Sequence, residues 1–383
     1  MVRKATGVSR RNVLKLTGGS LAMAGTTGLA SAAPTDKVEV NIGFKSQRGR
    51  NAALSAANDV VRDFNSINAV TIRIPKKAVS GLQNNPNVRY VEENGRMHAL
   101  AQTLPWGINR VDAETAHSNG DTGTGADIAI LDTGIDADHP DLEANLGSGK
   151  AFVSCRGGSC VTSWDDDNDH GTHCAGIADA VDNNQGIVGV STDATLHAVK
   201  VLDKRGSGSF SDIAAGVEYV AEQGWDVGSM SLGASSGSAT LRDACQYAVD
   251  NGVFLVAAAG NSGPCSDCVG YPAAYPEVMA VSSANDSDGL SSFSSTGSEV
   301  EIAAPGSSIY STIPGGYDTF SGTSMACPHV AGAAGQLMAN GASNTQARDT
   351  LKNSAEDIGL SENESGAGFL DVAAALGYDS SDN

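Results

Sequence analysis

Three short segments carry residue types that could together transfer an acyl group. An apolar run ends at Asp132, a run of small residues follows His170, and Ser324 opens a segment rich in glycine and alanine. A serine nucleophile needs a neutral imidazole to take its proton and a carboxylate to fix the imidazole tautomer. Each segment alone is a weak signal, but Asp, His, Ser is one of the known orders of a catalytic triad. These residues are therefore the candidate catalytic machinery.

The segment after Ser324 predicts a helix that begins near this serine. We expect Pro328 in the first turn of the helix, where its missing N–H group costs no hydrogen bond. The free N–H groups and the dipole at a helix N-terminus stabilise the negative charge that a tetrahedral oxyanion carries. The position of Ser324 thus suits nucleophilic chemistry.

The elements that must position these residues predict an α/β domain. Near-continuous apolar strands alternate with helices, which indicates a parallel sheet buried on both faces. Asp132 follows one of these strands, and sites in such sheets form at the carboxyl ends of strands. The expected strands are Asp127–Leu131, Leu196–Val201, Val253–Ala258 and Val278–Ser282, and the expected helices include Asp212–Gln223 and Ala239–Asp250.

A smaller α+β module is expected before this domain. Strands with alternating apolar residues are separated by amphipathic stretches, in the order strand, helix, strand, helix, strand. The expected strands are Val38–Phe44, Val70–Ile74 and Val88–Glu93, and the expected helices are Ala52–Phe64 and Ala78–Asn84.

The first 32 residues predict a signal peptide. A basic flank with the pair Arg10 and Arg11 precedes a short apolar run that ends in Ala30-Ser31-Ala32, as in twin-arginine signals. A membrane helix is the alternative, but the run from Leu16 contains glycine and hydroxyl residues and is too short to span a bilayer. We therefore expect a secreted, extracellular protein exported by the twin-arginine route.

The charge balance is strongly acidic, with 44 Asp and Glu against 24 Lys and Arg. A formal net charge of −20 repels nucleic acid and anionic lipid, so neither nucleic acid nor a membrane is an expected partner after export. Ordinary acidic solubility and adaptation to high salt both explain the excess. We favour salt adaptation, because salt screens the self-repulsion of a highly charged fold.

From Ala101 to Leu376 the chain resembles the catalytic domain of the subtilases, peptidase family S8, and within it the halolysin and thermitase type. The resemblance rests on Asp132-Thr133-Gly134, His170-Gly171-Thr172-His173 and Gly322-Thr323-Ser324-Met325-Ala326. It implies a subtilisin-like three-layer fold with a mostly parallel central sheet flanked by helices. It also implies a serine endopeptidase with an acyl-enzyme intermediate, in which Ser324 is the nucleophile, His170 the base and then the acid, and Asp132 the residue that orients His170.

The same resemblance assigns further site residues. Asn261, after a buried strand, corresponds to the side-chain donor of the oxyanion hole. Other segments correspond to those that pair with an extended peptide substrate and line the pocket for P1, the side chain before the scissile bond. They imply a broad substrate preference, mainly for apolar and aromatic P1 residues. The substrate-binding residues implied are Gly208, Ser231, Leu232, Gly233, Ala259, Gly260 and Gly270.

The resemblance also divides the chain into functional parts. Residues 33–100 resemble an inhibitor-type propeptide, which would bind its own catalytic domain until cleavage near Leu100–Ala101; a permanent regulatory domain is the alternative. Residues 101–378 would form the catalytic domain and residues 379–383 an acidic tail. A monomer that acts on protein and peptide substrates is expected. A catalytically inactive homologue that only binds partners is the alternative function, although every catalytic position is intact.

A structural calcium ion is the one cofactor that the resemblance implies, and no organic cofactor is expected. Oxygen ligands of the kind that Ca²⁺ prefers occur at the matching positions. The acidic run Asp165–Asp169 is compatible either with a second ion or with a solvated acidic surface. The implied calcium ligands are Gln102, Asp141, Val181, Asn183, Gln185 and Ile187.

Seven cysteines leave at least one without a disulfide partner. Cys155 with Cys160, and Cys265 with Cys268, are candidate local disulfides in an exported protein. A zinc site built from these four cysteines is the alternative and is disfavoured in an oxidising compartment. His173, one turn after His170, is expected to pack in a helix rather than bind a metal. His170 itself is expected to titrate near its ordinary pKa of about 6.5.

Overall fold

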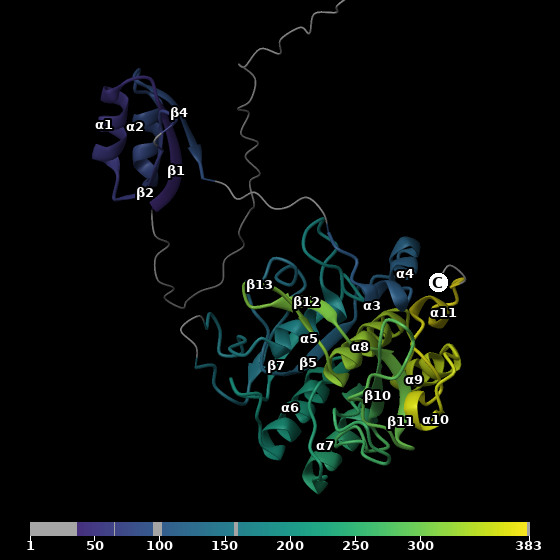
Figure 1. The fold of residues 1–383 in the computed structure, drawn as a ribbon. Helices are drawn as coiled ribbons and strands as arrows, with labels where there is room; N and C mark the ends of the chain where they lie inside the picture. The colour runs from purple at the N-terminus through teal and green to yellow at the C-terminus, as the bar shows by residue number, and fades with distance from the viewer. Residues whose placement is uncertain (1–36, 65, 95–101, 157–159, 381–383) are drawn as a thin grey trace, which may run out of the picture. The chain divides into compact units, whose positions relative to one another are not determined.

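The computed structural model describes residues 37–64, 66–94, 102–156 and 160–380. The expected signal peptide, the expected cleavage point and the end of the acidic tail lie outside these residues. The chain divides after Met97 into two compact units, which are described separately (Figure 1). No helix in the described part of the chain is long and apolar enough to cross a bilayer.

The first unit is a four-stranded antiparallel sheet with two helices. The strands lie in the order β2-β3-β1-β4, and an apolar core that includes Val40, Ile42, Val70 and Ile72 joins sheet and helices. The elements are β1 (Lys37–Phe44), α1 (Gln47–Ala56), β2 (Asp59–Asp63), β3 (Ala69–Pro75), α2 (Val79–Gln83) and β4 (Val88–Glu93).

The predicted helix Ala52–Phe64 is wrong in its second half. Helix α1 ends at Ala56, and the backbone N–H of Asn58 donates to the carbonyl of Arg73, which starts the pairing of β2 with β3. Val60 and Val61 are 46% and 41% exposed, so their helical spacing did not mark a buried face. Both are β-branched and fit an edge strand better than a helix.

The second unit is built around a seven-stranded parallel sheet in the order β11-β10-β9-β8-β5-β7-β6. The α/β architecture expected from the sequence is confirmed. The strands are β5 (Asp127–Asp132), β6 (Lys150–Ala151), β7 (Thr195–Lys200), β8 (Val227–Met230), β9 (Phe254–Ala258), β10 (Met279–Ala284) and β11 (Val300–Pro305). A hairpin of β12 (Ile309–Ile313) and β13 (Gly316–Phe320) lies apart from this sheet.

Helices cover both faces of this sheet, which makes three layers (Figure 1). Alternate residues of β5 belong to different cores: Ile128 and Ile130 pack with the helices α5 and α8, whereas Ala129 and Leu131 pack with α6 and α7. The helices are α3 (Trp106–Arg110), α4 (Ala113–Asn119), α5 (His170–Asp179), α6 (Phe210–Gln223), α7 (Ala239–Asp250), α8 (Thr323–Ala339), α9 (Asn344–Asn353), α10 (Glu362–Ser365) and α11 (Val372–Ala375).

Candidate active site

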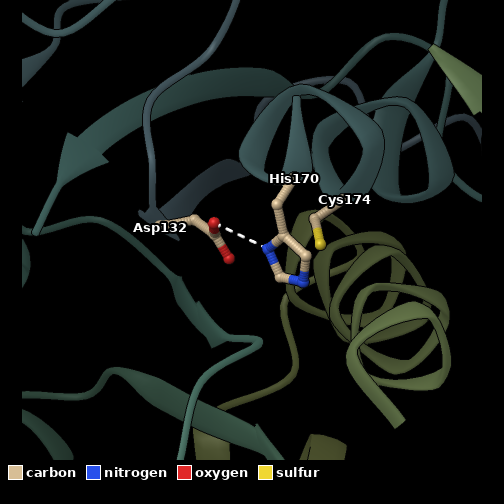
Figure 2. A group of neighbouring side chains, drawn as sticks. All are labelled: Asp132, His170 and Cys174. Atoms are coloured by element: carbon tan, nitrogen blue, oxygen red, sulfur yellow. Dashed lines mark hydrogen bonds and ion pairs between the residues drawn. The ribbon is translucent and has the colours of Figure 1, made fainter. Parts of the chain in front are cut away.

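Asp132 and His170 meet where β5 ends and α5 begins. The Nδ1 atom of His170 lies 2.8 Å from Oδ1 of Asp132, and the backbone N–H of Thr133 donates to the same oxygen at 2.7 Å (Figure 2). The Asp132 side chain is 1% exposed and the His170 side chain 28%. A buried carboxylate therefore holds a partly accessible imidazole in one orientation, with Nδ1 as the donor.

The pKa of His170 is raised above its ordinary value of 6.5. Burial is the largest influence and disfavours the charged imidazolium, but the charge and hydrogen bond of Asp132 and the charge of Asp166 together outweigh it. The pKa of His170 is therefore expected above 6.5 rather than near it. The main cause of the rise is the contact with Asp132, to which the charge of Asp166, in the folded loop before α5, adds a smaller contribution.

This shift gives a prediction for the pH dependence of activity. A general base must be neutral to accept a proton, and a raised pKa keeps His170 charged to a higher pH. We expect kcat/KM for a neutral peptide substrate to rise with pH through a midpoint above 6.5. A pH profile of kcat/KM measures this midpoint directly, and a midpoint at or below 6.5 would contradict the assignment of His170 or the shift.

Ser324 is the second residue of α8, after the extended residue Gly322. Its Oγ donates to the backbone carbonyl of Ser231 at 3.3 Å, and its own carbonyl accepts from Oγ of Ser231 at 2.7 Å. No hydrogen bond joins Ser324 to His170 among the described side chains. Hydrogen bonds of this type are often long without substrate and tighten in the complex, so the arrangement is compatible with a nucleophile.

Pro328 is the sixth residue of α8, so the prediction that it lies in the first turn is wrong. A proline in the second turn has no N–H to donate to the carbonyl four residues earlier, which belongs to Ser324. That carbonyl instead accepts hydrogen bonds from the side chains of Ser231 and Cys174, at 2.7 and 3.4 Å. Because Pro328 leaves this carbonyl free, Ser231, directly after β8, and Cys174 of α5 both bind the start of α8 through it.

Cys174 lies one turn after His170 and beside the imidazole, as Figure 2 shows. A carboxylate oxygen of Asp132, a ring nitrogen of His170 and the sulfur of Cys174 lie within 4.8 Å of one another. The thiol is fully buried, and burial raises its pKa well above the ordinary value. Cys174 therefore stays protonated and donates to the Ser324 carbonyl, so it does not compete as a nucleophile.

Asn261 follows β9 and points its amide nitrogen toward the start of α8. A Cβ atom added to Gly322 would lie 3.3 Å from Nδ2 of Asn261 and 3.6 Å from the backbone nitrogen of Ser324. Both nitrogens therefore border the same small space. Thr323 fixes the amide, because its backbone N–H and its hydroxyl both donate to Oδ1 of Asn261, at 2.9 and 3.0 Å. Sequence reasoning missed Thr323, whose buried hydroxyl gives no local signal.

Two hollows share the segment Ser231–Ala234 as a common wall. The Asn261 hollow, of about 590 Å³, is also bordered by Ser324, and the Phe210 hollow, of about 640 Å³, by His170. The predicted substrate-binding residues Ser231, Leu232 and Gly233 line both, Gly260 and Gly270 line the first, and Gly208 lines the second.

Ala259 is the exception among the predicted substrate-binding residues. Its side chain is fully buried and lines neither hollow. Its carbonyl accepts the backbone N–H of Gly270 at 2.8 Å, so it supports the wall from behind.

The residues predicted to bind calcium converge in the structure. The amide nitrogen of Gln102 lies 2.8 Å from the carbonyl oxygens of both Val181 and Ile187. Asp141 is fully buried and accepts from the backbone N–H of Ile187 at 2.8 Å, and Nδ2 of Asn183 lies 3.4 Å from its other oxygen. The backbone N–H of Gln185 donates to Oδ1 of Asn183. The set consists of carboxylate, amide and carbonyl oxygens, which is the chemistry that Ca²⁺ requires.

The acidic run before α5 is largely internal. Asp165 and Asp166 are 3% and 4% exposed, so a solvated acidic surface does not describe them. Asp166 accepts from Oγ1 of Thr133 at 2.9 Å and from Oγ1 of Thr172 at 2.6 Å. These bonds tie the residue after Asp132 to the first turn of α5, and so help to hold Asp132 and His170 together.

Lys200, at the end of β7, supports the same loop. It is fully buried, donates to Asp167 at 2.7 Å and also donates to the carbonyl of Thr133. A buried ammonium without these partners would be strongly destabilising. The single lysine in an apolar strand gave no sequence signal for this role.

Four of the seven cysteines form disulfides in the structure, Cys155 with Cys160 and Cys265 with Cys268. The zinc alternative therefore does not apply. Cys174, Cys245 and Cys327 are free and buried. His173 is fully buried, stacks on Phe320 and lies 3.1 Å from the carbonyl of Ile309, while burial lowers its pKa to about 4. It packs as the sequence predicts.

Comparison with known proteins identifies two regions of the chain. Residues 123–369 match the Subtilase family, and residues 37–94 match the fervidolysin N-terminal prodomain. The first match lies within the second unit and includes Asp132, His170, Asn261 and Ser324.

Similar proteins match over most of the chain. Subtilisin amylosacchariticus of Bacillus subtilis subsp. amylosacchariticus is 42% identical, over 90% of this chain and 92% of its own. Subtilisin E of Bacillus subtilis strain 168 is 41% identical over the same shares. An alkaline protease of Alkalihalobacillus alcalophilus is 40% identical over 93% of this chain and 96% of its own.

Proposed function

Since the chain belongs to the subtilase family of serine proteases, we propose that it is an endopeptidase with Ser324, His170 and Asp132 as its triad. The observation that carries the proposal is the 2.8 Å contact of Asp132 with His170, together with the link from the His170 helix to Ser324, whose carbonyl accepts from Cys174 at the start of α8. The fold brings three segments, separated by up to 192 positions (324 minus 132), near the carboxyl ends of the neighbouring strands β5 and β8.

The residues act in sequence during hydrolysis of a peptide bond. His170 takes the proton of the Ser324 hydroxyl through Nε2, while Asp132 keeps the imidazole oriented and stabilises the imidazolium that forms. The Ser324 oxygen attacks the carbonyl carbon, and the resulting oxyanion accepts from Nδ2 of Asn261 and the backbone N–H of Ser324. His170 then protonates the leaving amine, and water hydrolyses the acyl-enzyme by the same steps.

Casein hydrolysis at high salt by the mature chain tests this function. Hydrolysis that is abolished by preincubation with a fluorophosphonate supports it. A folded, mature chain that does not cleave casein would instead favour the inactive homologue.

The two hollows support broad specificity for protein substrates. An extended peptide that pairs with Ser231–Gly233 and with the segment around Gly208 would place its P1 side chain in the Asn261 hollow, beside Ser324. Leu232, Val269 and Tyr271 offer apolar contact there, which favours large apolar and aromatic P1 residues. Strict dependence on one P1 residue in a peptide library would contradict this.

The first unit is proposed to be an inhibitory propeptide. Its match to a prodomain and its separate core support this role. Cleavage near Leu100–Ala101 would release it. If it inhibits, the separately produced unit added to mature enzyme slows hydrolysis, and an unchanged rate would favour another role.

A structural calcium ion is proposed at the ligands that converge around Asp141. Gln102, Asp141 and Asn183 would supply side-chain oxygens, with Gln102 turned so that its oxygen faces the ion, and Val181, Gln185 and Ile187 would supply carbonyl oxygens. The ion would stabilise the folded state and take no part in the reaction.

Calcium removal gives a stability prediction. Chelation is expected to lower the Tm of the wild type by roughly 5–10 °C, because an ion at about 100 times its Kd contributes about 2.7 kcal/mol. In Asp141→Asn the Tm should depend far less on calcium, whereas the exposed matched variant Glu143→Gln should behave like the wild type. Differential scanning calorimetry with and without chelator measures this. Equal calcium dependence in Asp141→Asn and the wild type would contradict the site.

Secretion by the twin-arginine route and adaptation to high salt are proposed from the N-terminal sequence and the net charge of −20. The free energy of unfolding should therefore be larger in molar salt than in low salt. Equal stability in both would count against salt adaptation.

A further inference from the structure

The Asn261 hollow, next to Ser324, carries negative charge and no positive charge. Asp267 and Glu299 are among its lining residues, and none of the residues that line it is lysine, arginine or histidine. Neither carboxylate forms an ion pair within the described part of the chain. The electrostatic character of the hollow is therefore anionic, in addition to the apolar contacts already described.

Glu299 and Asp267 belong to the same wall of the hollow. A Cβ atom added to Gly297 would lie 2.7 Å from Oε2 of Glu299, 3.1 Å from Cγ2 of Val269 and 3.6 Å from Cα of Asp267. The Glu299 carboxylate and the backbone of Asp267 thus both lie close to Gly297. Val269 belongs to the wall of the hollow as well.

The loop that carries Asp267 is fixed from both ends. The disulfide between Cys265 and Cys268 closes it. The hydroxyl of Thr296 donates to the Cys265 carbonyl at 2.7 Å, and the backbone N–H of Cys268 donates to the Thr296 carbonyl at 2.9 Å. Asp267 therefore cannot move far from Glu299, although both residues are exposed to solvent.

We propose that the Asn261 hollow accepts lysine and arginine at P1, with Glu299 and Asp267 as the specificity-determining residues. This inference rests on the proposed function and extends its specificity beyond apolar and aromatic side chains. A lysine or arginine stem packs along apolar surface such as Val269 and Tyr271 while its charged end reaches the carboxylates. The same two charges repel a glutamate or aspartate at P1.

The contribution of the carboxylates should be moderate and sensitive to salt. Both are exposed, so water and ions screen their attraction for a cation. Substrates with lysine at P1 should therefore be cleaved in addition to those with apolar P1 residues, not in place of them. The ratio of kcat/KM for lysine to that for an uncharged side chain of the same length should fall as the salt concentration rises.

The test uses four peptide p-nitroanilides that are identical except for phenylalanine, lysine, norleucine or glutamate at P1. Norleucine matches the aliphatic chain of lysine without its charge, so the ratio of kcat/KM for lysine to that for norleucine isolates the charge effect. The ratio is measured at fixed calcium and at two salt concentrations. The enzymes are the mature wild type, Glu299→Gln, Asp267→Asn, the double variant and Glu222→Gln. Glu222→Gln is a matched control, because it removes an exposed carboxylate of α6 that lines neither hollow.

We expect the lysine-to-norleucine ratio to fall roughly fivefold in each single variant and further in the double variant, with Glu222→Gln unchanged. Glu222→Gln should cleave the phenylalanine substrate at the wild-type rate, and the carboxylate variants should lose far less kcat/KM for phenylalanine than for lysine. Asparagine also tolerates the left-handed backbone of Asp267, so this substitution keeps the loop conformation.

Two outcomes would overturn the inference. One is a wild type that cleaves the phenylalanine but not the lysine substrate. The other is a lysine-to-norleucine ratio that the double variant leaves unchanged, or that Glu222→Gln lowers equally. A wild type that cleaves none of the four substrates would instead contradict the proposed function itself.

Discussion

Replacing Ser324 with alanine is expected to lower kcat for peptide hydrolysis by on the order of 10⁶-fold, the size of effect already known for the nucleophile of subtilisin. The alanine variant has no oxygen to attack the substrate, and the remaining activity comes from binding and the oxyanion donors. Stability should hardly change, because the lost hydroxyl makes one long hydrogen bond, 3.3 Å to Ser231. Purified variant and wild type are compared by kcat and by Tm.

A neighbouring serine provides the control for this variant. Ser262→Ala removes a hydroxyl from an exposed residue that also lines the Asn261 hollow, and it should keep most of the activity. If Ser324→Ala retained more than about 1% of wild-type kcat, Ser324 could not be the nucleophile.

Replacing Asn261 with leucine is expected to lower kcat by about 10²–10³-fold with little change in KM, again the size known for the equivalent loss in subtilisin. The side chain keeps its volume but loses Nδ2, which borders the space beside the Ser324 backbone nitrogen. The oxyanion forms only after attack, so its donor contributes to the transition state more than to substrate binding.

The variant Thr323→Val distinguishes the contribution of the Asn261 amide from that of the hydroxyl that orients it. This variant keeps Asn261 but removes the hydroxyl that donates to Oδ1, while the backbone N–H of residue 323 still holds the amide. Its loss of kcat should be clearly smaller than that of Asn261→Leu. An Asn261→Leu enzyme with unchanged kcat and raised KM would show that Asn261 binds the ground state instead.

The candidate triad could be identified from the sequence because each member stands in a short local motif at the end or beginning of a regular element. Asp132 ends a strand of the parallel sheet, where sites in such sheets form, and Ser324 begins a glycine- and alanine-rich helix. The four strands predicted for the large sheet are also near-continuous apolar runs, which burial on both faces requires.

The features that the sequence did not reveal depend on contacts between distant segments. Thr323 orients Asn261 across 62 positions, and Lys200 reaches Asp167 across 33. The pKa of His170 is raised mainly by Asp132 and further by Asp166, and both carboxylates come near the imidazole only in the folded chain. Strand β8 was not predicted, because Gly228 and Ser229 interrupt its apolar pattern; an added Cβ at Gly228 would lie 2.8 Å from a methyl carbon of Leu255.

The most direct measurement of the central claim is labelling of the mature chain with a fluorophosphonate, followed by peptide mapping by mass spectrometry. If Ser324 is the nucleophile, we expect a single adduct, on its Oγ atom, that appears in parallel with the loss of casein hydrolysis and is absent from His170→Ala. An adduct on another residue, or a chain that hydrolyses casein after complete labelling of Ser324, would contradict the account.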